Sequence, residues 1–262
     1  MTKNIAIVRI STPNELVTAG ESLYNPWFRG HGCDKWRLES SLERDANNFG
    51  VPREALWERE QTMLTLFKER AHLYTSEFTA PTTEFEWFSL IRHYGGPSRM
   101  LDVSSSYLVA TYFALCDSHP KRDAAIWAFQ EANVTEKEYP NFDTLFQCNH
   151  PLDLKIGSPN RLNMRLQAQS GKFFVPGSIN ASLESQIAAK FDTDFRKKPT
   201  IYRSVHRIKT ERRHSIWKFI MPRSAHSELF RFISRCNVRA YSLIPGIDGL
   251  AASLREMMRA YD

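Results

Sequence analysis

The sequence predicts an α+β protein, a single mixed domain in which helices flank a central antiparallel or mixed sheet. Residues 54–74 carry apolar side chains at helical spacing. Short apolar runs, typical of buried strands, cover residues 5–10, 124–129 and 216–221. Neither a repeat nor a clear linker divides the 262 residues, so we expect one domain over residues 1–262.

The first half of the chain is predicted to alternate strands and helices. Residues 12–14, Thr-Pro-Asn, end the first strand. Beyond the long helix, residues 84–93 form a second one, which the Gly-Gly-Pro of residues 95–97 stops. Residues 98–103 are extended, and a serine-capped helix follows over residues 106–116.

The second half has weaker signals. Residues 131–165 are polar and are expected to form loops, whereas residues 167–175 predict one or two short strands. Further helices are expected over residues 182–191, 202–208 and 225–236. Residues 243–246 predict a strand end and a turn, after which Asp248 caps a last helix. The residues expected on the inner side of that helix are Leu250, Leu254, Met257 and Met258.

Composition bounds the class of protein. No run of eighteen apolar residues predicts a membrane span, and the N-terminus lacks the apolar run of a signal peptide. The four cysteines are Cys33, Cys116, Cys148 and Cys236, and no CxxC pair predicts a zinc site or a disulfide framework. We therefore expect a cytoplasmic protein that has no metal site and does not contact membranes.

A formal net charge of +6 and a pI of about 9.2 favour polyanionic partners. The charge is concentrated in the basic stretch over residues 196–218. Its candidate nucleic-acid-binding residues are Arg203, Arg207, Lys209, Arg212 and Arg213. The alternative is that this stretch is simply a solvated surface.

Two motifs could carry chemistry. Residues 27–32, Trp-Phe-Arg-Gly-His-Gly, place Arg29 between aromatic residues and glycines, and its guanidinium suits a phosphate or a carboxylate. Residues 93–106 combine a histidine, an arginine, an aspartate and four serines around a glycine turn. Backbone amides and hydroxyls at a helix start favour anions. The alternatives are an ion-paired arginine at a strand end, pairing of Arg99 with Asp102, and serines that only cap a helix.

These motifs resemble the FRG domain family, named for its (Phe/Tyr)-Arg-Gly motif. The matching segments are 28–30 with 36–44, 93–102, 110–114, 169–173 and 243–250. They follow the family order and span about residues 27–254. The chain departs from the family at Arg92, where a glutamine often stands, and at Val103-Ser104, where the family has Trp-Thr.

The order of the motifs is also similar to that of ADP-ribosyltransferases of the arginine–serine–glutamate type. This resemblance implies an ADP-ribosyltransferase-like fold with NAD as the substrate. The catalytic residues that it implies are Arg29, His93, Asp102 and Gln169. The implied NAD-binding residues are Arg29, Gly30, His31, Arg99, Ser104 and Ser105. Gln169 stands near the place of the expected catalytic glutamate, so Asp102 or Glu184 would have to supply the carboxylate.

Three functions follow as hypotheses. The first is an NAD-dependent ADP-ribosyltransferase-like enzyme, a toxin or antiphage-defence effector that modifies nucleic acid or protein. The second is a non-catalytic module that binds a nucleotide or nucleic acid, because a glutamine cannot act as a base. The third is a hydrolase or nuclease that uses His93 and Asp102.

Overall fold

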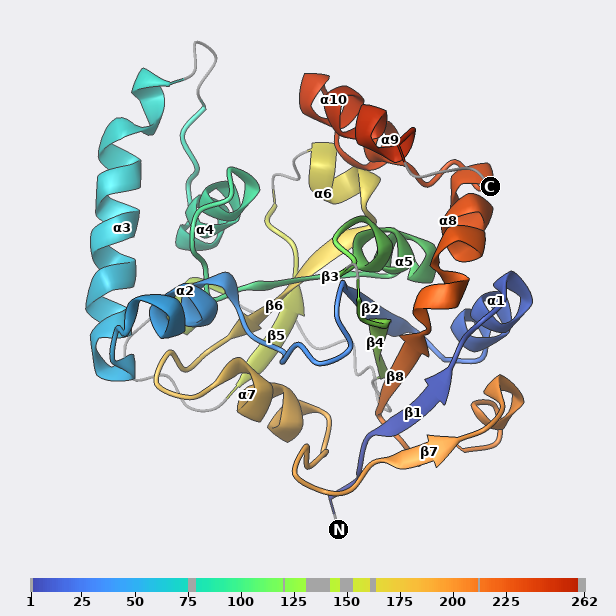
Figure 1. Ribbon diagram of the computed structural model, residues 1–262. Helices are drawn as coiled ribbons and strands as arrows, with labels where there is room; N and C mark the ends of the chain where they lie inside the picture. Colours follow the sequence, from blue (N-terminus) through green and yellow to red (C-terminus); the bar gives the residue numbers. More distant parts are fainter. Residues whose placement is uncertain are drawn as a thin grey trace.

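The computed structural model describes residues 2–74, 79–119, 121–130, 142–146, 153–160, 164–211 and 213–258. The strands are β1 (Ala6–Arg9), β2 (Pro26–His31), β3 (Leu101–Ser104), β4 (Ala124–Gln130), β5 (Leu154–Gly157), β6 (Gly171–Pro176), β7 (Thr200–Tyr202) and β8 (Ile216–Met221). They form one sheet in the order β5-β6-β3-β2-β4-β8-β1-β7. Strand β1 runs parallel to β7 and β8, and the other neighbours are antiparallel. The predicted mixed sheet is therefore confirmed (Figure 1).

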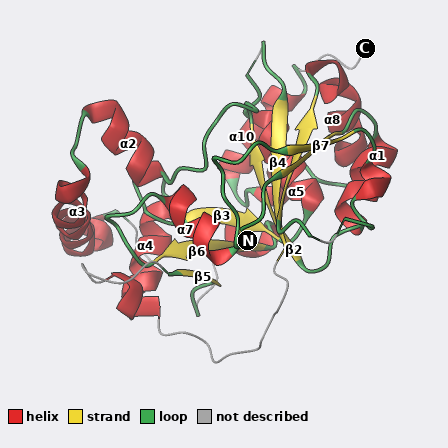
Figure 2. Cartoon of the chain, turned by 90° about the horizontal axis from the view of Figure 1, so that it is seen from below, coloured by secondary structure: helices red, strands yellow, loops and turns green. Residues whose placement is uncertain are grey.

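Helices cover both faces of this sheet. They are α1 (Pro13–Glu21), α2 (Ser41–Phe49), α3 (Leu56–Arg70), α4 (Glu84–His93), α5 (Tyr107–Cys116), α6 (Met164–Ala168), α7 (Leu183–Lys190), α8 (His226–Arg235), α9 (Ala240–Leu243) and α10 (Ile247–Glu256). Helices α1, α5 and α8 share one apolar core with β1, β2, β4 and β8, while α7 packs on the opposite face. Helices α3 and α4 form a third core with β6. Figure 2 shows β3, β5 and β6 turned well away from the direction of β2 and β4.

Gly30 sets how closely α5 approaches β2. A Cβ atom built on Gly30 would lie 2.0 Å from the Ala110 carbonyl oxygen and 2.6 Å from the Ala114 amide nitrogen. Phe28, on the same face of β2, packs edge-on against Tyr107 of α5. Successive side chains of a strand point to opposite faces, so Arg29 is directed away from α5.

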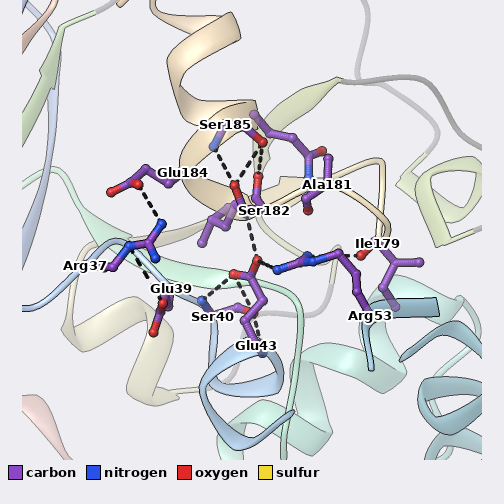
Figure 3. Close-up of polar contacts among 12 residues, drawn as sticks. Arg37, Glu39, Ser40, Glu43, Arg53, Ile179, Ala181, Ser182, Glu184 and Ser185 are labelled. Carbon is purple, nitrogen blue, oxygen red and sulfur yellow. Dashed lines mark hydrogen bonds and ion pairs between the residues drawn. The ribbon is translucent and has the colours of Figure 1, made fainter. Parts of the chain in front are cut away.

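Glu43 joins three segments through one buried carboxylate (Figure 3). Its Oε2 accepts hydrogen bonds from the amide and the hydroxyl of Ser40, which caps α2. Its Oε1 accepts from the Leu183 amide at the start of α7 and from Arg53 Nη2, at 3.0 and 3.2 Å. The capping box thereby also fixes where α7 lies relative to α2.

Several sequence expectations hold closely. The helices expected over 84–93, 106–116, 182–191 and 225–236 correspond to α4, α5, α7 and α8, and Ser106 is the N-cap of α5. The long helix over 54–74 is α3 with a 3-10 turn at each end.

Four expectations are wrong in part. Residues 12–14 end the strand but also start α1, because Thr12 and Glu15 form a capping box and Pro13 is well placed in a first helical turn. Residues 167–175 hold the end of α6 before the single strand β6. Within the segment 131–165, residues 131–141, 147–152 and 161–163 lie outside the described residues, and the described part contains β5. Residues 202–208 hold the end of β7 and a 3-10 turn rather than a helix.

The C-terminal region also differs from expectation. Residues 243–246 hold the end of the short helix α9, and Gly246, with φ of +96°, is the N-cap of α10 in place of Asp248. The residues expected on the inner side of that helix, Leu250, Leu254, Met257 and Met258, are all exposed. Every helix in the described part of the chain is too short or too polar to cross a bilayer.

Gly30→Ala should destabilise the fold by about 3 kcal/mol, since the added methyl group meets backbone atoms of α5 that cannot rotate away. Gly50→Ala is the matched control. Its φ is +64° and nothing lies within 4 Å of the added atom, so it should cost only about 1 kcal/mol. Urea denaturation measures both values, and equal losses would contradict the close packing of α5.

Candidate functional site

Arg29 lies where β2 meets β3. Its Nη1 donates a hydrogen bond to the Asp102 carbonyl oxygen at 2.8 Å and lies 3.6 Å from Asp102 Oδ2. Arg92, at the end of α4, donates to the same Oδ2 from Nε and Nη2, at 3.0 and 2.6 Å. One carboxylate thus holds two arginines from different elements at the centre of the sheet.

Burial and charge act on these groups in opposite ways. Burial lowers the pKa of Arg29 to about 10, which the attraction of Asp102 only partly offsets, and Arg29 stays protonated at neutral pH. Burial opposes ionisation of Asp102, yet Arg92 and Arg29 together hold the pKa of Asp102 below its usual value. The site therefore contains two cations around one anion.

Arg29 also carries a donor that no described residue accepts. The Nε–H of Arg29 is buried and has no hydrogen-bond partner among the described residues. Arg44, an exposed residue of α2, adds a further positive charge that lowers the pKa of Arg29, while the opposing effect of Asp117 is smaller. Because buried donors are nearly always satisfied, this arrangement suits an anionic ligand.

Ser104 and Gln169 contact each other where β3 pairs with β2. Ser104 faces Phe28 across the β2–β3 pair. Its hydroxyl donates to the Gln169 carbonyl oxygen at 2.7 Å and accepts from the Ser106 amide at 3.0 Å. The Gln169 side-chain amide donates to the Leu243 carbonyl oxygen at 3.1 Å. Arg29 thus contacts Asp102, and Ser104 contacts Gln169. The pairing of Ser104 with Phe28 places the Ser104 side chain on the Phe28 face of the sheet, away from the face to which Arg29 is directed. Protein groups already bind both Ser104 and Gln169.

His31 lies on the same face of β2 as Arg29. Burial is the main reason that the pKa of His31 falls to about 3, and the charge of Arg29 adds to the effect. Its Nδ1 accepts a hydrogen bond from Trp127 Nε1 at 3.3 Å. His31 is therefore a neutral, buried residue at physiological pH.

The remaining predicted residues have structural surroundings. Arg99 is buried, forms an ion pair with Glu60 of α3 and donates to the Leu145 carbonyl oxygen at 3.0 Å. Its suggested pairing with Asp102 is wrong. Gly30 faces α5, and Ser105 donates to the Ser170 carbonyl oxygen at 3.4 Å.

His93 ends α4 and packs edge-on against Tyr94, while burial and Arg165 lower its pKa. The Asp102 carboxylate is held by the two arginines. The placement of these residues gives no support to a catalytic pair of His93 and Asp102.

The basic stretch lies at the far edge of the sheet, with three strands between β7 and β2. Arg203, Arg207, Lys209 and Arg213 are exposed, as a binding surface requires. Glu211, however, forms ion pairs with Arg207 and Arg213 at 3.1 and 3.2 Å. Arg212 lies outside the described residues.

Sequence reasoning missed two residues of the site, Arg92 and Arg44. Arg92 was visible as a departure from the FRG pattern, because a cation replaces the usual glutamine next to His93. Arg44 directly follows the glutamate of the Ser40–Glu43 capping box. A capping box predicts where a helix starts but not which way the helix then runs, so it does not show that Arg44 lies near Arg29.

Comparison with protein-family models supports the resemblance to the FRG domain family. Residues 24–123 match the FRG domain. The FRG match runs from just before β2 to the residue before β4, so it includes Arg29, Arg92 and Asp102 and excludes Gln169. Comparisons with curated proteins and with solved structures found no match.

Arg99→Met should destabilise the protein by about 3–5 kcal/mol, because it leaves the buried Glu60 carboxylate without its partner. The double variant Arg99→Met/Glu60→Leu should recover a large part of that loss, since it removes both charges. Chemical denaturation of the three proteins tests this. A double variant as unstable as Arg99→Met would contradict a mainly structural role for Arg99.

His31 should make stability fall as the pH falls below 6.5. Its folded pKa of about 3 lies below the unfolded value, so protons bind the unfolded chain first. Between pH 7 and pH 5 this effect should lower the free energy of unfolding by about 2 kcal/mol. Urea denaturation of His31→Gln should show a correspondingly smaller loss, whereas the exposed His72→Gln should behave as the unaltered chain does.

Proposed function

We propose that the chain binds NAD at Arg29 and acts as an NAD-dependent ADP-ribosyltransferase-like enzyme. The observation that carries this proposal is the buried, unpartnered Nε–H of Arg29 beside the exposed Arg44. The NAD diphosphate offers several anionic oxygens, and a guanidinium donates to such groups in a fixed fork.

The proposed reaction breaks the N-glycosidic bond of NAD and passes the ADP-ribosyl group to a nucleophile of the acceptor. Nicotinamide leaves with the bond electrons, and the sugar carbon becomes positively charged in the transition state. Among the described groups bonded to Arg29, Asp102 supplies the negative charge. Its lowered pKa makes it a weak base, so electrostatic stabilisation of the sugar cation is the role that suits it.

A second candidate is a nucleotide-binding module without catalysis. A specific observation favours it: the Gln169 amide and the Ser104 hydroxyl are both engaged by protein groups. A site whose open donor, among the described residues, is the Arg29 Nε–H can bind an anion without activating an acceptor.

Arg29→Lys should weaken NAD binding about tenfold or more, because lysine keeps the charge but loses the Nε–H and the planar fork. Calorimetric titration measures the affinity, and chromatography measures release of nicotinamide. Arg9→Lys, at an exposed position on β1, is the control and should change neither value.

The results separate the two candidates. Release of nicotinamide together with binding supports the enzyme, and binding without release supports the module. NAD affinity that is unchanged in Arg29→Lys would contradict the proposed site in both cases.

A further inference from the structure

An apolar groove separates α3 from α4, away from Arg29. Its volume is about 580 Å³. The apolar residues that line it include Met63, Leu66, Phe67, Leu90, Ile91 and Tyr94. Leu66 and Tyr94 are 45% and 68% exposed and lie in one contiguous apolar surface, which is typical of an interaction site. The groove therefore has the character of a docking surface.

Helix α10 carries an apolar stripe that packs on none of the apolar cores formed by the described residues. Ile247, Leu250, Leu254 and Met258 follow one another at helical spacing, the last just beyond α10, and each is more than half exposed. The opposite side of α10 is the anchored one, where Glu256 accepts a hydrogen bond from the Ala240 amide. Apolar residues at i, i+3 and i+7 are the pattern with which a helix fills a groove.

The charges beside the two surfaces are complementary. Arg70, at the C-terminal end of α3, is the charged residue among those that line the groove. Asp248 is exposed in the first turn of α10. Neither has an ion-pair partner among the residues that the structure describes. A helix laid antiparallel to α3 would bring Asp248 to Arg70 and the N-terminus of α10 to the C-terminus of α3, which also suits the helix dipoles.

The two surfaces lie too far apart to meet within one chain. Figure 1 shows α3 at one side of the molecule and α10 beyond α4 and α6, and Figure 2 shows the same separation. We infer that α10 of one copy docks into the α3–α4 groove of a second copy. Because the surfaces differ, the contact is head-to-tail, and each added copy presents a new groove and a new helix.

The experiment measures the mass of the full chain by light scattering over a range of concentrations. The unaltered protein should increase in mass with concentration, and Leu254→Asp should stay monomeric. Arg70→Asp and Asp248→Arg should each weaken association about tenfold or more, because each places like charges opposite one another. Circular dichroism should show all variants folded, since the altered side chains are exposed.

Mixing the two charge variants, Arg70→Asp and Asp248→Arg, tests the proposed contact most directly. Helix α10 of Asp248→Arg then meets the groove of Arg70→Asp with opposite charges, so association should return in the mixture although each variant alone stays weak. Three results would overturn the inference: a protein that is monomeric at every concentration, association that survives Leu254→Asp, or a mixture no stronger than its components.

Discussion

The contact between β2 and α5 at Gly30 is the constraint on which the candidate site depends. Any larger residue would push α5 off the sheet, because backbone atoms of α5 occupy the place of a side chain. With α5 held there, Phe28 joins the core on that face and Arg29 is directed to the other. The glycine of the Phe-Arg-Gly motif thus has a packing role, and the arginine is the residue of the motif that can bind a ligand.

The charged groups around Arg29 belong to three different elements, and different contacts hold each element in place. Asp102 belongs to β3 and Arg92 to α4, whereas Arg44 belongs to α2. The direction of α2 follows from Glu43, whose carboxylate also binds Arg53 and the first amide of α7. Two acids with similar side chains therefore differ in role: Glu43 fixes a helix, and Asp102 gathers cations. The two roles differ because Glu43 binds backbone amides and Arg53, whereas Asp102 binds two arginines.

Local signals in the sequence predicted much of the fold and only part of the site. The α4 and α5 boundaries were predicted closely, because a Gly-Gly-Pro stop and a serine cap act over a few residues. The pairing of Arg29 with Asp102 joins positions 73 apart, which no local pattern reveals. Arg99 and Asp102 stand three apart, but extended backbone directs such residues to opposite sides, so they have different partners. The exposed stripe of α10 was predicted to face the core. Periodicity shows that one face of a helix is apolar, but it does not show what packs against that face.

The same arrangement favours the binding of an anion more directly than the transfer of ADP-ribose. A buried donor without a protein partner favours an anionic ligand whatever follows. Transfer of ADP-ribose further needs a carboxylate near the sugar, and the hydrogen bonds of Arg92 oppose any protonation of Asp102. A carboxylate held in this way can stabilise a developing cation but accepts a proton poorly. In the proposed transfer, the proton of the acceptor nucleophile must therefore pass to a base other than Asp102: a group of the acceptor, a water molecule, or another carboxylate such as Glu184, which Arg37 binds at 3.0 Å.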